Sequence, residues 1–108
     1  MKDTGKIVVF ITTSSEAEAK KISELLLTKR KAACVNIVPK VDSRFWWQGK
    51  LDSAEESLLI VKTKASVLQE IVDLVKGAHS YSVPEIIALP IIGGSEDYLK
   101  WVEDEVRG

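Results

Sequence analysis

Two short stretches of this chain, residues 7–11 and 58–61, are apolar at every position instead of alternating between apolar and polar residues. The first runs on to Thr12 and is rich in β-branched residues, which favour β-strands. Successive side chains of a strand point to opposite faces of a sheet, so each of these strands must bury both faces. Helices of the same chain can cover one face. For the other face we expect a second copy of the chain, or, as the alternative, a helix at the chain's end.

The remaining segments predict helices and strands in a recognisable order. The ranges are strand 7–12, a helix from Ser15 to about Lys29, an extended stretch 33–47, strand 58–61 closing at Lys62–Thr63, a helix over about 68–75, strand 86–91 and a last helix after Ser95. This is an α/β (α+β) pattern, the ferredoxin-like β-α-β-β-α-β sandwich with an extra C-terminal helix. No linker, repeat or low-complexity segment interrupts it, so residues 1–108 are expected to form a single domain.

Local signals mark where these elements begin and end. Ser15 and Ser66 each start a capping box, with a glutamate or glutamine three residues later. Pro39 within the extended stretch indicates an edge strand or a bulge. Residues 48–50 are typical of a hairpin turn, and Gly77 is the expected end of the second helix.

Charge and cysteine content exclude several classes of protein. The chain has 15 lysines and arginines against 16 aspartates and glutamates, so a nucleic-acid partner is not expected. The basic cluster at residues 29–31 lies where a helix should end and complements its dipole. No stretch approaches the about 20 apolar residues of a membrane span. Cys34 is the single cysteine, which we expect to be buried as a small hydrophobe in a reducing, cytoplasmic compartment.

A set of short motifs in a fixed order closely resembles the CutA divalent-cation tolerance family, from about Ile7 to Val106. The motifs are Lys31-Ala32-Ala33-Cys34-Val35-Asn36-Ile37-Val38-Pro39, Ser43 with Trp46-Trp47 and Gly49-Lys50, Glu55-Glu56 with Lys62-Thr63, His79, Tyr81 and Pro84-Glu85-Ile86, and Pro90-Ile91 with Gly93, Tyr98-Leu99 and Trp101. The resemblance implies a ferredoxin-like protomer in a tight homotrimer, with an overall plan similar to that of the PII signalling proteins.

The resemblance also implies a link to copper and other divalent metals. In copper-binding members it implies paired histidines at the positions of Ala78 and His79, and a cysteine at that of Ile11. Only His79 is present here, and a single imidazole implies weak, exchangeable binding. From the residues alone, His79 is either a hydrogen-bonded structural residue or a metal ligand.

The residues that follow His79 form the second group of candidates. Tyr81, Pro84 and Glu85 come close together in the sequence, and Glu85 stands beside apolar isoleucines. A partly buried carboxylate needs a partner or a raised pKa, and Lys62 is the expected partner. Two interpretations remain open: a structural ion pair at a subunit boundary, with Pro84 as a structural residue, or a ligand pocket.

The tryptophans and the small acidic or glycine-rich clusters leave similar alternatives. Trp46 and Trp47 point to opposite faces of a strand, so one can enter the core while the other faces a neighbouring subunit or a cleft. We expect Trp47 at the trimer interface and Trp46 in the candidate cleft. Trp101 is expected to pack the last helix onto the body. Residues 93–95 offer a weak anion site at a helix start, and the acidic clusters 55–56 and 103–105 are expected to be solvated surface or, less favoured, cation ligands.

The sequence therefore favours a non-enzymatic, homotrimeric protein of the response to divalent metals. No motif for a nucleophile, a Walker loop or a Cys-x-x-Cys pair is present. No cofactor is obligatory, and Cu(II) or another divalent cation is the ion that the resemblance implies. The alternatives are a sensor of a small molecule or anion in a cleft formed by Trp46, Lys62, Tyr81 and Glu85, and a trimeric scaffold for another protein.

Overall fold

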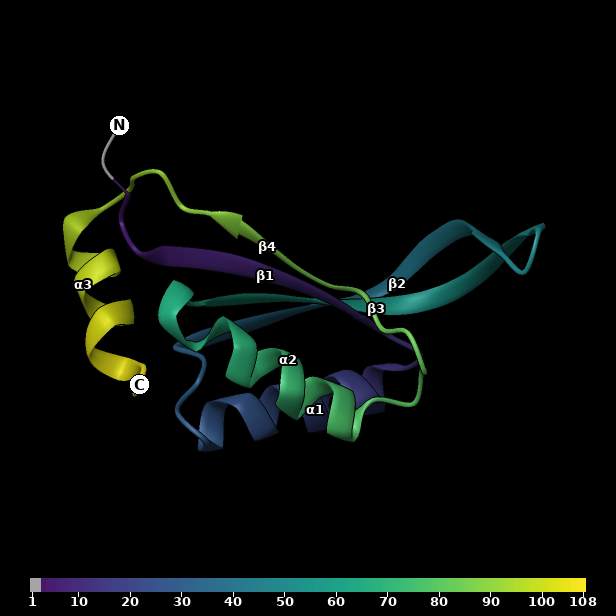
Figure 1. Cartoon of the computed structure of the whole chain (residues 1–108), viewed down its shortest axis with the longest axis horizontal. Coiled ribbons are helices and arrows are strands. Elements are labelled where there is room, and N and C mark those ends of the chain that lie inside the picture. The colour runs from purple at the N-terminus through teal and green to yellow at the C-terminus, as the bar shows by residue number, and fades with distance from the viewer. Residues whose placement is uncertain (1–2) are drawn as a thin grey trace.

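The computed structural model describes residues 3–108 and contains one four-stranded antiparallel sheet (Figure 1). Its strands lie in the order β2-β3-β1-β4. The predicted ferredoxin-like order of elements, including the terminal helix, is confirmed. The elements are β1 (Lys6–Thr13), α1 (Glu16–Thr28), β2 (Cys34–Trp47), β3 (Lys50–Lys64), the 3₁₀ turn η1 (Ala65–Val67), α2 (Leu68–Ala78), β4 (Ile86–Pro90) and α3 (Glu96–Glu105).

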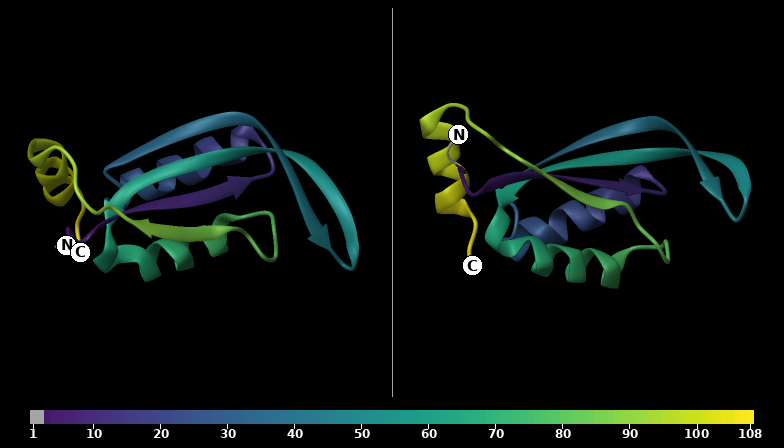
Figure 2. Two further views of the ribbon diagram at one scale, coloured as in Figure 1. Left: turned by 90° about the horizontal axis from the view of Figure 1, so that it is seen from above. Right: turned by 45° about the horizontal axis from the view of Figure 1, so that its top comes forward.

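The core lies between one face of the sheet and the helices α1 and α2, which cover that face (Figures 1 and 2). Every second residue of β1 is buried, with Val9 and Ile11 fully inaccessible. The helices contribute Ile22, Leu26 and Ile71, which are also fully buried. Each such aliphatic side chain contributes about 1.5–3 kcal/mol on burial, so this layer holds sheet and helices together.

The opposite face of the sheet is apolar and only partly covered. Val8, Phe10 and Ile60 are half-buried there, while Ile87 and Leu89 on β4 are 52% and 43% exposed. Helix α3 lies across one end of the sheet and leaves this face open (Figures 1 and 2). The alternative in which the terminal helix covers the second face is therefore wrong.

Strands β2 and β3 extend past the helices as a two-stranded arm, residues 41–56, at the end of the molecule away from α3 (Figure 1). The expected strand 58–61 was too short. Residues 50–57 are mostly polar, and they form a strand because they pair with β2. The bulge expected near Pro39 is confirmed by a register shift between Val38 and Val41, and β2 is an edge strand.

The turn expected at the tip of the arm is confirmed. Gln48 and Gly49 have φ angles of 52° and 78°, the left-handed conformation that a two-residue hairpin turn of this twist requires. Glycine adopts it at no steric cost. The turn sets the register in which Trp47 lies opposite Lys50, and hence the face of the arm to which each later residue points.

Serine side chains cap helices α1 and α3. Ser15 accepts a hydrogen bond from the Glu18 amide, and Ser95 accepts one from the Tyr98 amide. The capping box at Ser66 is wrong: residues 65–67 form η1, and α2 starts at Leu68 without a side-chain cap. Val67 is fully buried, so its packing decides how the chain enters the helix. Helix α2 also runs past Gly77 to Ala78.

The α3 end of the sheet is held by buried valines beneath a set of ion pairs. Val102 is fully buried, whereas Trp101 remains 41% exposed and packs beside Tyr98 at a ring distance of 5.5 Å. The fully buried contact of α3 with the sheet is therefore Val102, and the expected packing of the helix by Trp101 stays a prediction. Glu103 bridges Lys6 and Lys64 at 2.9 and 3.1 Å.

The basic cluster at residues 29–31 follows helix α1 instead of forming its last turn, which contains no basic residue. Arg30 pairs with Glu105 of α3 at 3.0 Å, and Lys31 pairs with Glu70 of α2 at 2.8 Å. Cys34, expected to be buried, is half-exposed at the start of β2. No helix among residues 3–108 is long and apolar enough to cross a membrane.

Candidate functional site

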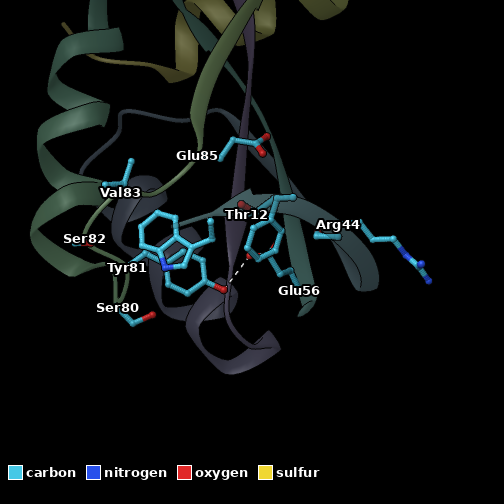
Figure 3. Close-up of a pocket in the computed structure, with 11 residues that line it drawn as sticks. Thr12, Arg44, Glu56, Ser80, Tyr81, Ser82, Val83 and Glu85 are labelled. Carbon is cyan, nitrogen blue, oxygen red and sulfur yellow. Dashed lines mark hydrogen bonds between the residues drawn. The ribbon is translucent and has the colours of Figure 1, made fainter. Parts of the chain in front are cut away.

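A cavity of about 750 Å³ lies where the arm meets the loop of residues 79–85 that joins α2 to β4 (Figure 3). Strand β1 ends at its floor, with Thr12 facing it. Its walls combine carboxylates, hydroxyls and aromatic rings. The lining residues are Thr12, Ser43, Arg44, Phe45, Trp47, Glu56, Ser80, Tyr81, Ser82, Val83 and Glu85.

Glu56 and Tyr81 form the central contact of this cavity. Glu56 is only 7% exposed, and its Oε2 accepts a hydrogen bond of 2.8 Å from the Tyr81 hydroxyl (Figure 3). Burial and the hydrogen bond to Glu56 together raise the pKa of Tyr81 to about 12. The phenol therefore stays protonated at neutral pH and continues to donate to the carboxylate.

Glu85 lines the same cavity and adds a second negative charge. Burial, followed by the negative charge of Glu56, raises the pKa of the Glu85 carboxyl above its usual value. Among the ion pairs formed by residues 3–108, none involves Glu56 or Glu85. The cavity thus concentrates two carboxylates that the described part of the chain does not neutralise.

Lys62 is not the partner of Glu85, as the sequence had led us to expect. It lies opposite Cys34 on β2 and donates a hydrogen bond to Asn36. In the register of β1 and β3, Lys62 faces Val8 whereas the cavity lies beyond Thr12. Four residues along a strand span about 13 Å, too far for an ion pair.

Among residues 3–108, Arg44 is the one cation that lines the cavity, and it is turned away from the two carboxylates (Figure 3). Its side chain is 79% exposed and pairs with Asp42 on the same strand at 3.2 Å. Exposed pairs of this kind contribute little to stability, and this one leaves the charge of the cavity unchanged.

His79 holds the loop in place through both of its ring nitrogens. Its Nδ1 accepts from the Tyr81 amide at 3.0 Å, which leaves the proton on Nε2 to donate to the Thr12 carbonyl at 2.7 Å. The imidazole also packs beside the Tyr81 ring at 4.9 Å. Within the protomer His79 therefore presents no free nitrogen to a metal, and its observed contacts are those of a structural residue.

A second clamp ties the loop to the start of helix α1. Glu18 accepts hydrogen bonds from the Ser14 amide at 2.9 Å and from the Ser80 amide at 2.7 Å. Burial alone would raise the pKa of Glu18, but these hydrogen bonds outweigh it and lower the pKa to about 2. The carboxylate thus stays ionised and fixes the residue next to Tyr81.

The structure brings together only part of the predicted cleft. Tyr81 and Glu85 line one cavity, and Pro84 lies half-buried in the same loop. Trp46 lies on the opposite face of the arm and is 71% exposed, whereas Trp47 lines the cavity and is 47% exposed. Trp47 thus occupies the position of the expected aromatic wall.

Sequence reasoning missed Glu56, which it treated as part of a solvated acidic cluster. The signal that could have found Glu56 is the alternation of side chains between the two faces of a strand. Glu56 shares its face of β3 with Leu58 and Ile60, while Glu55 points the other way. Phe45 and Thr12 were also not singled out, although both line the cavity.

The other candidate clusters are engaged in structural contacts. Ser95, in the glycine-rich segment 93–95, caps α3, and the acidic residues Glu103 to Glu105 form ion pairs with lysine and arginine side chains. Nowhere among residues 3–108 do three or more His, Cys, Asp or Glu side chains gather in a way that could hold a metal ion.

Comparison with known proteins gives a consistent result. The model of the CutA1 divalent ion tolerance protein family matches residues 7–105. The chain is 43% identical to the chloroplastic protein CutA of Arabidopsis thaliana over 98% of its own length and 58% of that relative, so it spans little more than half of the plant protein. It is 45% identical to the divalent-cation tolerance protein CutA of Archaeoglobus fulgidus, over 92% of this chain and 96% of the relative. The solved structure of the Thermus thermophilus divalent cation tolerance protein superposes with a TM-score of 0.93 at 43% identity, covering 94% and 99% of the two chains.

Proposed function

Because this chain belongs to the CutA1 divalent ion tolerance family, we propose that it acts as a homotrimer in the response to divalent cations, by binding and without catalysing a reaction. The whole of residues 1–108 acts as one domain in this proposal. A cytoplasmic location stays a prediction, and the plant relative is named as chloroplastic.

The half-covered apolar face of the sheet supports self-association. Ile87 and Leu89 expose their side chains on that face, and Trp46 and Leu51 near the tip of the arm are 71% and 70% exposed. A small monomer rarely leaves this much apolar surface in contact with water. Light scattering coupled to size exclusion should give a mass of three protomers, unchanged by a chelator. A monomer mass would contradict the proposal.

The observation that carries cation binding is the pair of carboxylates in the cavity, Glu56 and Glu85. Carboxylate oxygens are ligands for hard divalent cations, and carboxylates also bind Cu(II). Two carboxylates without a third ligand group give weak, exchangeable binding. His79 takes no part in this site, because both of its nitrogens are engaged.

Calorimetry with Cu(II) and Mn²⁺ on tag-free protein tests this site. We expect the heat of binding to fall in Glu56→Gln and Glu85→Gln, which keep the size of each side chain. Glu55→Gln is the matched control, since Glu55 is exposed on the other face of the arm. Equal heats in all three variants would place the bound cation elsewhere.

The aromatic side chains of the cavity favour a second candidate function, the sensing of a small molecule. Phe45, Trp47 and Tyr81 supply a wall that a bare cation does not need. The PII-like plan expected for the trimer suits such a sensor. A thermal-shift screen of metabolites and anions tests it. No shift with any of them at millimolar concentration would count against this candidate.

A further inference from the structure

The cavity pairs unneutralised carboxylates with aromatic rings, and this combination matches one chemical class of ligand. We propose that it binds a small organic ammonium ion, a primary amine that is protonated at neutral pH and carries an apolar body. The proposal rests on the second candidate function above, since it names the ligand class of the same cavity.

The charge of the cavity favours a cation. Glu56 and Glu85 both line it, and neither takes part in an ion pair with any of residues 3–108. Arg44 is turned outward and engaged with Asp42. Because the negative charge of Glu56 adds to burial in disfavouring the ionised form of Glu85, a positive charge bound between them would favour the ionised Glu85 carboxylate.

The aromatic rings favour an organic cation over a hard metal ion as the tighter-binding ligand of this cavity. Ring faces attract a cation within about 6 Å of the ring centre, and Phe45, Trp47 and Tyr81 all line the cavity. Val83, which is 72% exposed, adds apolar surface at the rim. A hard metal ion would instead need about six oxygen ligands, and residues 3–108 do not assemble even three side chains of the metal-binding types.

The volume of the cavity and the hydrogen bonds that its carboxylates can accept narrow the class of ligand further. A volume of about 750 Å³ is that of a site for a small organic molecule. A primary ammonium offers three donors to the carboxylates of Glu56 and Glu85, whereas a quaternary ammonium offers none. We therefore expect a primary amine to bind more tightly than tetramethylammonium.

The test uses the assembled full chain, titrated at pH 7 with 2-phenylethylamine and followed by calorimetry and tryptophan fluorescence. The neutral probe 2-phenylethanol has nearly the same shape without the charge. We expect the amine to bind and the alcohol to bind at least about fivefold more weakly, because the alcohol lacks the charge-assisted hydrogen bonds to the carboxylates.

Two pairs of variants locate the interaction. Glu85→Gln should weaken amine binding about fivefold, and Trp47→Leu about two- to fivefold. Glu55→Gln and Trp46→Leu, on the opposite face of the arm, should leave it unchanged. Phe45→Leu replaces Trp47→Leu if light scattering shows that the latter fails to assemble.

Equal binding of amine and alcohol would overturn the proposal, as would equal effects of the two tryptophan variants. Cu(II) calorimetry on the same proteins separates this failure from that of the proposed function. If Cu(II) binds and loses heat in Glu85→Gln while the amine does not bind, only the ligand class is wrong. If neither binds, the cavity is not a ligand site and both proposals fall.

Discussion

Within residues 3–108, charged side chains form ion pairs at one end of the sheet, whereas two carboxylates remain without an ion pair at the other end. At the α3 end, Glu103 is bridged by Lys6 and Lys64, and Arg30 is paired with Glu105. At the arm end, the carboxylates of Glu56 and Glu85 share a cavity, and neither forms an ion pair with any of residues 3–108, since Arg44 at its edge is paired with Asp42.

This difference separates structural charges from charges available for binding. Paired surface charges are satisfied within the protomer and hold α3 against the sheet. Like charges held together in a cavity raise the free energy of the folded chain, and a ligand of opposite charge recovers that free energy. The predictions below test the contrast, from the largest expected effect to the smallest.

Removing the apolar packing beneath the paired charges should have the largest effect. Val102→Ala deletes two methyl groups from a fully buried site and should lower the free energy of unfolding by about 2 kcal/mol. Denaturant unfolding at a fixed protomer concentration measures it. Lys100→Ala, on the exposed side of α3, is the control and should unfold like the parent. A loss below about 0.5 kcal/mol would mean that the ion pairs, not Val102, hold the helix.

At the arm end, Glu18→Gln should loosen the loop that carries Tyr81. It removes a carboxylate that accepts from the Ser14 and Ser80 amides, and we expect a loss of about 1 kcal/mol at pH 7 after allowance for solvent screening. Because the folded pKa of Glu18 is lowered to about 2, its contribution is present above the usual carboxyl pKa and disappears as the pH falls toward 2.

Unfolding measured at pH 7, 4 and 3 checks this sign. The stability difference between parent and Glu18→Gln should shrink steadily with acid. Glu16→Gln, an exposed neighbour on the same helix, should show a smaller difference at every pH. A difference that stays constant down to pH 3 would mean that the charge of Glu18 is not what fixes the loop.

Breaking the ion pairs of Glu103 at the α3 end should lower the free energy of unfolding by less than Glu18→Gln does. Hydrogen bonds from Lys6 and Lys64 lower the pKa of Glu103, so its contribution is present at neutral pH and is lost in acid. Glu103→Gln should cost about 0.5 kcal/mol, and 1 M salt should abolish the difference because the carboxylate is half-exposed. A difference that persists in salt would show that the pair is effectively buried.

Removing a negative charge from the cavity should raise the free energy of unfolding, whereas the preceding substitutions lower it. The pKa of Glu85 is raised by burial and by Glu56, so the folded state disfavours the ionised carboxylate. The penalty is absent below the unfolded pKa and fully present above the folded one. Glu85→Gln should therefore stabilise the protein at pH 7, by about 0.5 kcal/mol or less given its exposure, and have no effect at pH 4. Destabilisation at pH 7 would mean that Glu85 has a partner.

The sequence predicted the topology and the uncovered apolar face because both follow from local patterns. Strands such as 7–12 show their burial in consecutive apolar residues, and helices such as α1 show theirs in a three-to-four residue spacing with a serine cap. The proximity of Tyr81 and Glu85 could also be predicted from the sequence, because residues four positions apart in one loop cannot lie far from each other.

The sequence predicted only some of the residues that line the cavity. Trp47, Glu56 and Tyr81 come from two strands and a loop, so their meeting depends on hairpin register and on how far the arm bends. A shift of one residue would have placed Trp46 and Glu55 there instead. The pairing expected between Lys62 and Glu85 failed for the same reason, since no local pattern records distance along a strand.

The sequence by itself determined the order of the elements and the apolar surface left for a partner, because periodicity, caps and turn residues act over a few positions. Only the tertiary structure decided which charges are paired. Glu103 forms ion pairs with two lysines, whereas Glu56 contacts a tyrosine and lies near another carboxylate. Glu103 and Glu56 nevertheless stand in similar acidic clusters in the sequence. Electrostatic partners are set by contacts between residues far apart in the chain, which exist only once the sheet is folded.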